Sequence, residues 1–122
     1  MIFSLLQETF AIARLPMSDA IPPWVAGELT SITRTADELS IVCRQDAVPP
    51  ETHADRGWQC LKLQGPIALS TIGMAADFTT LLADAGVGVL VISTFDTDYL
   101  LIKSDCLDRG IEALRAGGHS VR

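Results

Sequence analysis

The sequence is poor in the residues on which most metal, redox and catalytic sites depend. It contains three cysteines and two histidines among 122 residues. The cysteines are odd in number and widely spaced, which argues against a disulfide framework and favours a reducing cytoplasm. Neither His53 nor His119 has a cysteine or second histidine at metal-site spacing, so we expect no metal ion and no cofactor. Ser93 has no identifiable histidine partner, so a hydrolase triad is not expected.

Positive charge and long apolar runs are also scarce. The chain has 9 Lys and Arg against 15 Asp and Glu, a formal net charge of −6, and its basic residues are scattered singly. Nucleic-acid binding needs clustered basic side chains to neutralise phosphates, so no nucleic-acid partner is expected. No apolar run approaches the roughly 20 residues that span a membrane. The first residues lack a basic segment and reach Glu8 early, unlike a signal peptide. We expect a soluble cytoplasmic protein with no membrane partner.

What the sequence does have is a large apolar fraction, 48%, spaced with the periods of strands and helices. In the second half these periods and the Gly and Pro positions that interrupt them predict six elements. They are a strand at Gln59–Gln64, a helix capped by Ser70 or Thr71 and running to about Ala85, strands at Gly88–Ser93 and Asp98–Lys103, a helix from Ser104 or Asp105, and a short strand at His119–Val121. The order β-α-β-β-α-β predicts a ferredoxin-like α+β unit, with helices on one face of an antiparallel sheet.

The first half repeats part of this pattern at an offset of 60 residues. Ile32-Thr33 aligns with Ile92-Ser93, and Glu38-Leu39 aligns with Asp98-Tyr99. The segment Pro16–Gly27 has room for about one helical turn, so the first helix of this copy is predicted to be degraded. Gln45–Gly57 is predicted to be a linker with at most a turn of helix. We therefore expect an internal duplication with one degenerate copy.

The strand that precedes the second hairpin is apolar on both faces. Val89 and Val91 point one way, and Leu90 and Ile92 point the other. A sheet with one solvated face would alternate more cleanly, so this strand is predicted to be central and covered on both sides. The tip that follows it, Ser93–Asp98, carries three hydroxyls, an aromatic ring and two carboxylates. This tip is far more polar than the two strands that flank it.

Four segments together resemble a known family: Glu38–Cys43, Trp58–Pro66, Ala85–Gly88 and Ile92–Tyr99. They are similar to the bacterial tandem ACT-domain proteins, including the CASTOR-type arginine sensors and the ACT regions of aspartate kinases. The resemblance implies two ferredoxin-like ACT units in tandem, at 1–57 and 58–122, packed as one compact body. It also implies a non-catalytic regulatory protein that binds a small molecule, usually an amino acid, and acts as a homodimer or through a partner protein.

In such sensors the ligand lies between ACT units, where the loop before a helix faces the end of a strand. The matching positions are Ser70, Thr71, Ile72, Gly73, Ser93, Thr94, Phe95, Asp96 and Asp98. A helix start at Thr71–Gly73 offers free N–H groups to an α-carboxylate, and the two aspartates offer charge to an ammonium. Alternatively, the hydroxyls only cap the helix and the aspartates only favour a turn. The whole chain is then a ligand-free interaction or assembly domain.

Overall fold

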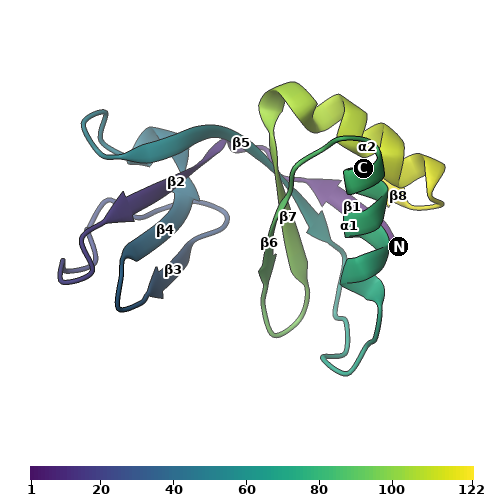
Figure 1. Cartoon of the computed structure of the whole chain (residues 1–122), viewed down its shortest axis with the longest axis horizontal. Helices are drawn as coiled ribbons and strands as arrows, with labels where there is room; N and C mark the ends of the chain where they lie inside the picture. The colour runs from purple at the N-terminus through teal and green to yellow at the C-terminus, as the bar shows by residue number, and fades with distance from the viewer. The chain divides into compact units, whose positions relative to one another are not determined.

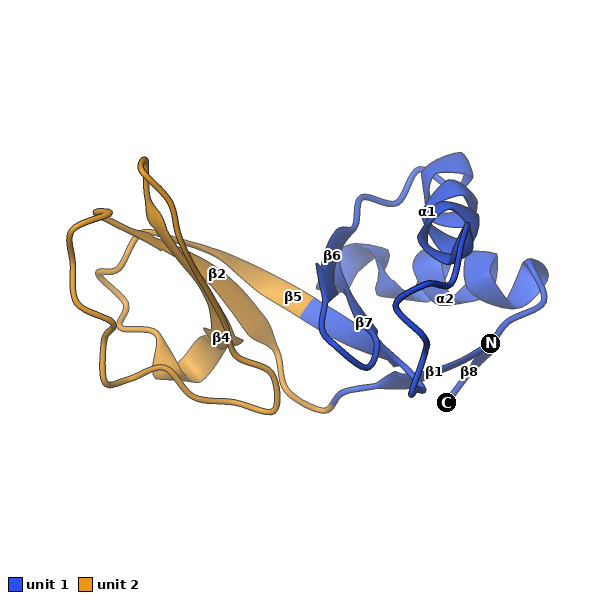
Figure 2. Ribbon diagram, turned by 90° about the horizontal axis from the view of Figure 1, so that it is seen from below, with its two compact units in different colours: residues 1–6, 59–122 blue, residues 7–58 orange.

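The computed structural model describes all residues, 1–122, and the chain forms two compact units (Figure 1). One unit comprises Met1–Leu6 and Gln59–Arg122, and the other comprises Gln7–Trp58 (Figure 2). The strands are β1 Ile2–Leu5, β2 Phe10–Leu15, β3 Ser31–Arg34, β4 Leu39–Arg44, β5 Ala54–Leu63, β6 Leu90–Ser93, β7 Asp98–Lys103 and β8 Ser120–Val121. The helices are α1 Met74–Asp84 and α2 Leu107–Ala116, with one-turn 3₁₀ helices η1 Gln45–Ala47 and η2 Ser104–Cys106. No helix is long and apolar enough to cross a membrane.

The unit with the helices has the predicted α+β architecture. Its strands lie in the order β8-β1-β5-β7-β6, and α1 and α2 pack on the same face of them (Figure 1). Alternate residues of β5 and β7, such as Leu61, Leu63, Leu100 and Ile102, point to that face and are buried. They form one apolar core with side chains of both helices, including Phe78, Leu82 and Leu114. The ferredoxin-like arrangement predicted for residues 58–122 is therefore confirmed.

The sequence analysis did not predict β1. This strand pairs antiparallel with β5, through Phe3 opposite Leu63, and parallel with β8, through Phe3 opposite Val121. It lies between β5 and β8, so the closing strand pairs with β1 and not with β5. Phe3 is fully buried and its ring meets that of Phe78 edge-on, with 5.7 Å between centroids. Residues 1–6 thus fold with the second half of the chain, although sequence order places them in the first.

The other unit is a four-stranded antiparallel sheet in the order β3-β4-β2-β5. The prediction that its first helix is degraded is confirmed, because residues 16–30 form turns and no helix. This segment brings Trp24 and Val25 against the buried face of β2 and β4, where a helix would otherwise pack. The prediction that Gln45–Gly57 is a linker is wrong for its last four residues, because β5 already begins at Ala54. Burial raises the pKa of the Cys43 thiol in this core, in keeping with an inert apolar role.

Strand β6 is an edge strand, and the prediction that it is central is wrong. It pairs only with β7, and Leu90, Val91 and Ile92 are half-buried. Val91 packs against the helix-side core, whereas Leu90 and Ile92 point to the other face. This edge strand is therefore apolar on both faces because each face is partly buried. Sequence periodicity alone does not distinguish such a strand from a fully buried central one.

Candidate functional site

A hollow of about 370 Å³ opens where the loop before α1, the start of α1 and the tip of the β6–β7 hairpin meet. All of its lining belongs to the unit of residues 1–6 and 59–122. The lining residues are Ile67, Ala68, Leu69, Thr71, Gly73, Met74, Ala75, Ala76, Ser93, Thr94, Phe95, Thr97 and Asp98. Most are apolar or small, and Asp98 is the one charged residue among them.

The start of α1 faces this hollow without a side-chain cap. The helix begins at Met74, and Gly73 before it has the left-handed conformation, with φ of 78°. No side chain caps this end, so the prediction that Ser70 or Thr71 does so is wrong. The first turn closes with the Asp77 N–H on the Gly73 carbonyl, which leaves the N–H groups of Met74, Ala75 and Ala76 unpaired. These groups and the helix dipole make the end of the hollow electropositive.

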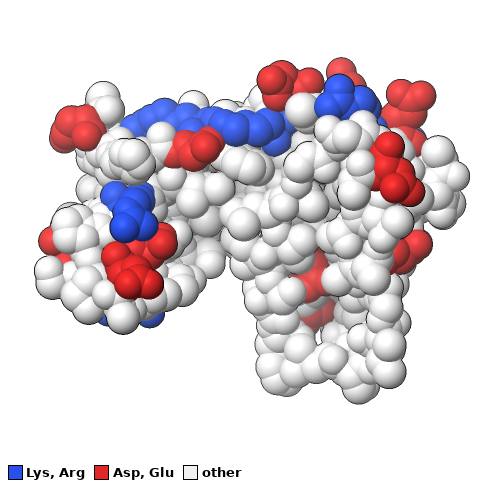
Figure 3. All heavy atoms as spheres, viewed as in Figure 1, with Lys and Arg blue, Asp and Glu red and all other residues white.

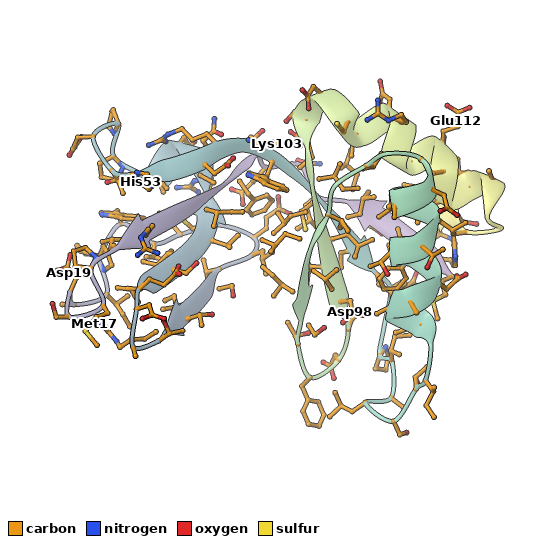
Figure 4. The ribbon with its side chains drawn as sticks, in the orientation of Figure 1. Met17, Asp19, His53, Asp98, Lys103 and Glu112 are labelled. Atoms are coloured by element: carbon orange, nitrogen blue, oxygen red, sulfur yellow. The ribbon has the colours of Figure 1, made fainter.

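Asp98 lines the same hollow and is only 9% exposed. It lies on β7 in alternation with Leu100 and Ile102, on the side of the strand that faces α1 (Figure 4). No hydrogen bond or ion pair joins its carboxylate to another side chain. Its oxygens are still accessible through the hollow, but a carboxylate on the core side of a strand with no protein partner loses part of its hydration, which costs free energy. The hollow therefore has a negative group on one side and free N–H donors on another.

Comparison of the two hairpins shows how unusual this aspartate is. Arg34 pairs with Leu39 in the β3–β4 hairpin, and Ser93 pairs with Asp98 in the β6–β7 hairpin. The equivalent residues are thus 59 apart, not 60 as the sequence comparison predicted, and strands β4 and β7 then have the same burial pattern. In this register Asp98 corresponds to Leu39, a fully buried core residue. A one-residue slip exchanges the two faces of a strand, so the offset of 60 had matched Asp98 with the wrong side chain.

The hairpin tip itself is tied down by hydrogen bonds that need no ligand. The Thr94 hydroxyl bonds both the N–H and the carbonyl of Thr97 across the turn, at 3.3 and 3.1 Å. Thr35 makes the same contacts with Glu38 in the other hairpin. Thr94 therefore has a structural role in the turn. The Thr97 hydroxyl donates to the Leu63 carbonyl at 2.5 Å, and the Ile67 N–H donates to the Asp96 carbonyl at 2.7 Å.

Gly65 allows this close approach of the tip to the loop after β5. A Cβ at this position would lie 2.8 Å from the Asp96 carbonyl oxygen and 3.2 Å from the Thr97 Cβ. We expect Gly65→Ala to lower the free energy of unfolding by about 1–3 kcal/mol in urea denaturation, because backbone must move. Gly88→Ala is the control, since a Cβ there meets nothing within 4 Å. Equal losses for the two variants would show that the approach at Gly65 does not matter.

The structure brings together most of the predicted site residues. Of the nine, Thr71, Gly73, Ser93, Thr94, Phe95 and Asp98 line the hollow. Ser70 and Asp96 line an adjoining hollow of about 530 Å³, which shares Ile67, Ala68, Leu69 and Phe95 with the first. Ile72 lines neither and is 95% exposed. Whether these residues bind a ligand stays a prediction.

Sequence reasoning missed the apolar wall of the site. Ile67 and Leu69 come from a loop without periodicity, so no pattern marked them. Met74 lies at the first position of α1 and contacts both the core and the hollow. Its exposed neighbours Ala75 and Ala76 carry no chemical signal beyond their place in the first turn.

No cation lines either hollow, since both lack Lys, Arg and His. On the face drawn in Figure 3, basic side chains are likewise absent around the hairpin end of this unit. Within the hollow, the feature of opposite sign to Asp98 is therefore the helix start. Elsewhere in the chain, no group of three or more His, Cys, Asp or Glu side chains has the geometry of a metal site.

A family model described as ACT domain matches residues 53–116. A second model, described as an N-terminal domain, matches residues 8–51. No curated protein matches the chain.

Solved structures extend the similarity to nearly the whole chain. Protein Atu0741 from Agrobacterium tumefaciens is 43% identical, with a TM-score of 0.93 over 99% of this chain and 91% of that one. A protein of unknown function from Vibrio cholerae, described as a possible transport protein, is 16% identical with a TM-score of 0.74, over 94% of this chain and 89% of that one. The ligand-free regulatory subunit of aspartate kinase from Thermus thermophilus is 12% identical with a TM-score of 0.66, over 95% and 97% of the two chains. At such identities the last two share the fold alone.

Proposed function

Since this chain belongs to the ACT domain family, we propose that it is a regulatory protein whose helical unit binds a free amino acid. The binding site is the hollow between the start of α1 and the tip of the β6–β7 hairpin. The α-carboxylate accepts hydrogen bonds from the N–H groups of Met74–Ala76, and the α-ammonium pairs with Asp98. The protein has no catalytic role in this proposal, and a second copy or a partner protein transmits the binding event in the cytoplasm.

The observation that carries the proposal is the position of Asp98, a largely buried residue whose carboxylate has no hydrogen-bond or ion-pair partner and reaches solvent only where it lines the hollow. In the other hairpin a leucine fills the equivalent core position. An apolar residue at position 98 would avoid the desolvation cost of the charge. That cost is offset when a ligand ammonium occupies the hollow, because a hydrogen bond between charged groups contributes about 1.5–3 kcal/mol. The free N–H groups of α1 supply the complementary sign that a zwitterion requires.

The likeness to a regulatory subunit of aspartate kinase supports a regulatory role. That subunit has the same fold at 12% identity, and its description names it as the regulatory subunit. The hollow described above contains no histidine, cysteine or lysine that would act as a nucleophile or general base. In this proposal the residues of the hollow bind the ligand and do not catalyse a reaction.

Thermal unfolding of the full chain with each of the twenty amino acids at millimolar concentration tests the proposal. A ligand at 100 times its Kd adds about 2.7 kcal/mol to the free energy of unfolding. For a unit of this size that is expected to raise Tm by about 10 °C or more. The Asp98→Asn variant keeps the shape of the side chain and should lose the response. If no amino acid raises Tm in the original chain, ligand sensing is wrong.

A second function, ligand-free assembly with a protein partner, is favoured by one feature. Leu69, Ile72 and Phe95, the three most exposed large apolar side chains of the molecule, all lie near this hollow. Exposed apolar groups that gather in one place often mark a protein contact. Assembly alone predicts self-association or complex formation that amino acids do not change and that Ile72→Ser weakens. Analytical ultracentrifugation with and without amino acids separates the two functions.

A further inference from the structure

The adjoining hollow of about 530 Å³ indicates where the side chain of a bound amino acid extends. It shares a wall of Ile67, Ala68, Leu69 and Phe95 with the hollow that contains Asp98. A ligand held between Asp98 and the start of α1 therefore has one continuous path outward, over this wall. The wall has no polar side chain, and the only polar side chains that line the adjoining hollow are those of Ser70 and Asp96.

Leu69 and Phe95 are 70% and 80% exposed in the empty site. Covering them with apolar ligand atoms removes apolar surface from water on both sides of the contact, which favours binding. An acidic ligand side chain finds no Lys, Arg or His in either hollow. A basic side chain finds Asp96, but this residue is exposed, and pairs between exposed charges contribute little because water screens them.

We infer that the ligand of this site is an amino acid with a branched or longer apolar side chain, which covers Leu69 and Phe95. The inference rests on the proposed function, since the ammonium and carboxylate positions come from it. Phe95 is then the residue that sets selectivity, whereas Asp98 and the helix start hold the groups common to all amino acids.

Titration calorimetry of the full chain with leucine, glycine, glutamate and lysine tests the selectivity. Leucine is expected to bind at least about tenfold more tightly than glycine, which has the same ammonium and carboxylate but no side chain. Glutamate and lysine are expected to bind more weakly than leucine. Tightest binding by lysine or glutamate would overturn the inference and leave the proposed function intact.

The variant Phe95→Ser locates the selectivity in the structure. Because the side chain is largely exposed, the variant should fold normally, which its Tm checks. It is expected to weaken leucine binding about tenfold and leave glycine binding unchanged. Ile72→Ser is the matched control, since Ile72 is exposed yet lines neither hollow. An equal effect of Phe95→Ser on leucine and glycine contradicts the inference. Absence of binding by all four overturns the inference, and the thermal screen with all twenty amino acids then decides separately whether the proposed function fails.

Discussion

Replacing Asp98 with leucine is expected to abolish amino-acid binding and at the same time make the protein more stable. The variant removes the charge of a residue that is 9% exposed and whose carboxylate has no protein partner. It also restores the residue that occupies the equivalent position, Leu39, in the other hairpin. Exchange of a buried unpaired charge for an apolar side chain of similar volume is expected to raise the free energy of unfolding by about 1–2 kcal/mol. Urea denaturation measures the gain, and calorimetry with leucine measures the loss of binding.

The reciprocal variant is the control for this prediction. Leu39→Asp places a carboxylate in a core without a hollow, where no ligand ammonium or helix start compensates it. It is expected to cost about 3–5 kcal/mol, because the charge is buried unpaired and the leucine packing is lost. A large loss of stability in Asp98→Leu, similar to that in Leu39→Asp, would mean that Asp98 supports the fold, and the account of a functional carboxylate would be wrong.

Phe3→Ala is expected to destabilise the helical unit severely. Phe3 is fully buried between β5 and β8 and contacts the rings of Phe78 and His119 edge-on. Truncation of a buried phenylalanine costs about 3–5 kcal/mol through lost apolar contact and the cavity left behind. That is a large share of the stability of a small domain. Hydrogen exchange should show loss of protection in β5, β8 and α1, although the substitution lies near the N-terminus.

Leu5→Ala is the control on the same strand. Its side chain is 38% exposed, and the hydrogen bond of its N–H to the Arg122 carbonyl does not depend on the side chain. A loss below about 1 kcal/mol is expected. If Phe3→Ala lowered the free energy of unfolding no more than Leu5→Ala, the side chains of β1 would not be part of the core of the helical unit.

Local sequence patterns were sufficient for the helical unit and insufficient for β1. The periodicity of α1 and α2 and the turn at Gly86 predicted the elements well, because these features depend on neighbouring residues. The pairing of Phe3 with Leu63 and Val121 joins residues 60 and more positions apart, and no local pattern encodes it. The start of α1 was predicted too early for a related reason. Ser70 and Thr71 are good capping residues, but the chain turns at Gly73, where φ of 78° suits glycine.

Only part of the candidate site was predicted, because the prediction selected residues by their charge and not by their position on the strand. Asp98 stood out in the sequence as a carboxylate between apolar strands, and it lines the hollow. Asp96, chosen on the same ground two positions earlier, lies outside that hollow. Successive side chains of a strand point to opposite faces of the sheet, but the residues of the turn between two strands do not follow this alternation. Only the register of β6 with β7 shows that Asp98 shares a face with Leu100 and Ile102.

Nuclear magnetic resonance titration of the ¹⁵N-labelled chain with leucine tests the central claim most directly. The account predicts that the largest amide shifts lie at Met74, Ala75 and Ala76, whose N–H groups are unpaired in the free protein and bond the carboxylate of the ligand. Residues 93–98 should shift as well, and leucinamide, which lacks the carboxylate, should leave the three helix amides nearly unchanged. Shifts confined to other parts of the chain, or identical shifts with leucine and leucinamide, would contradict it.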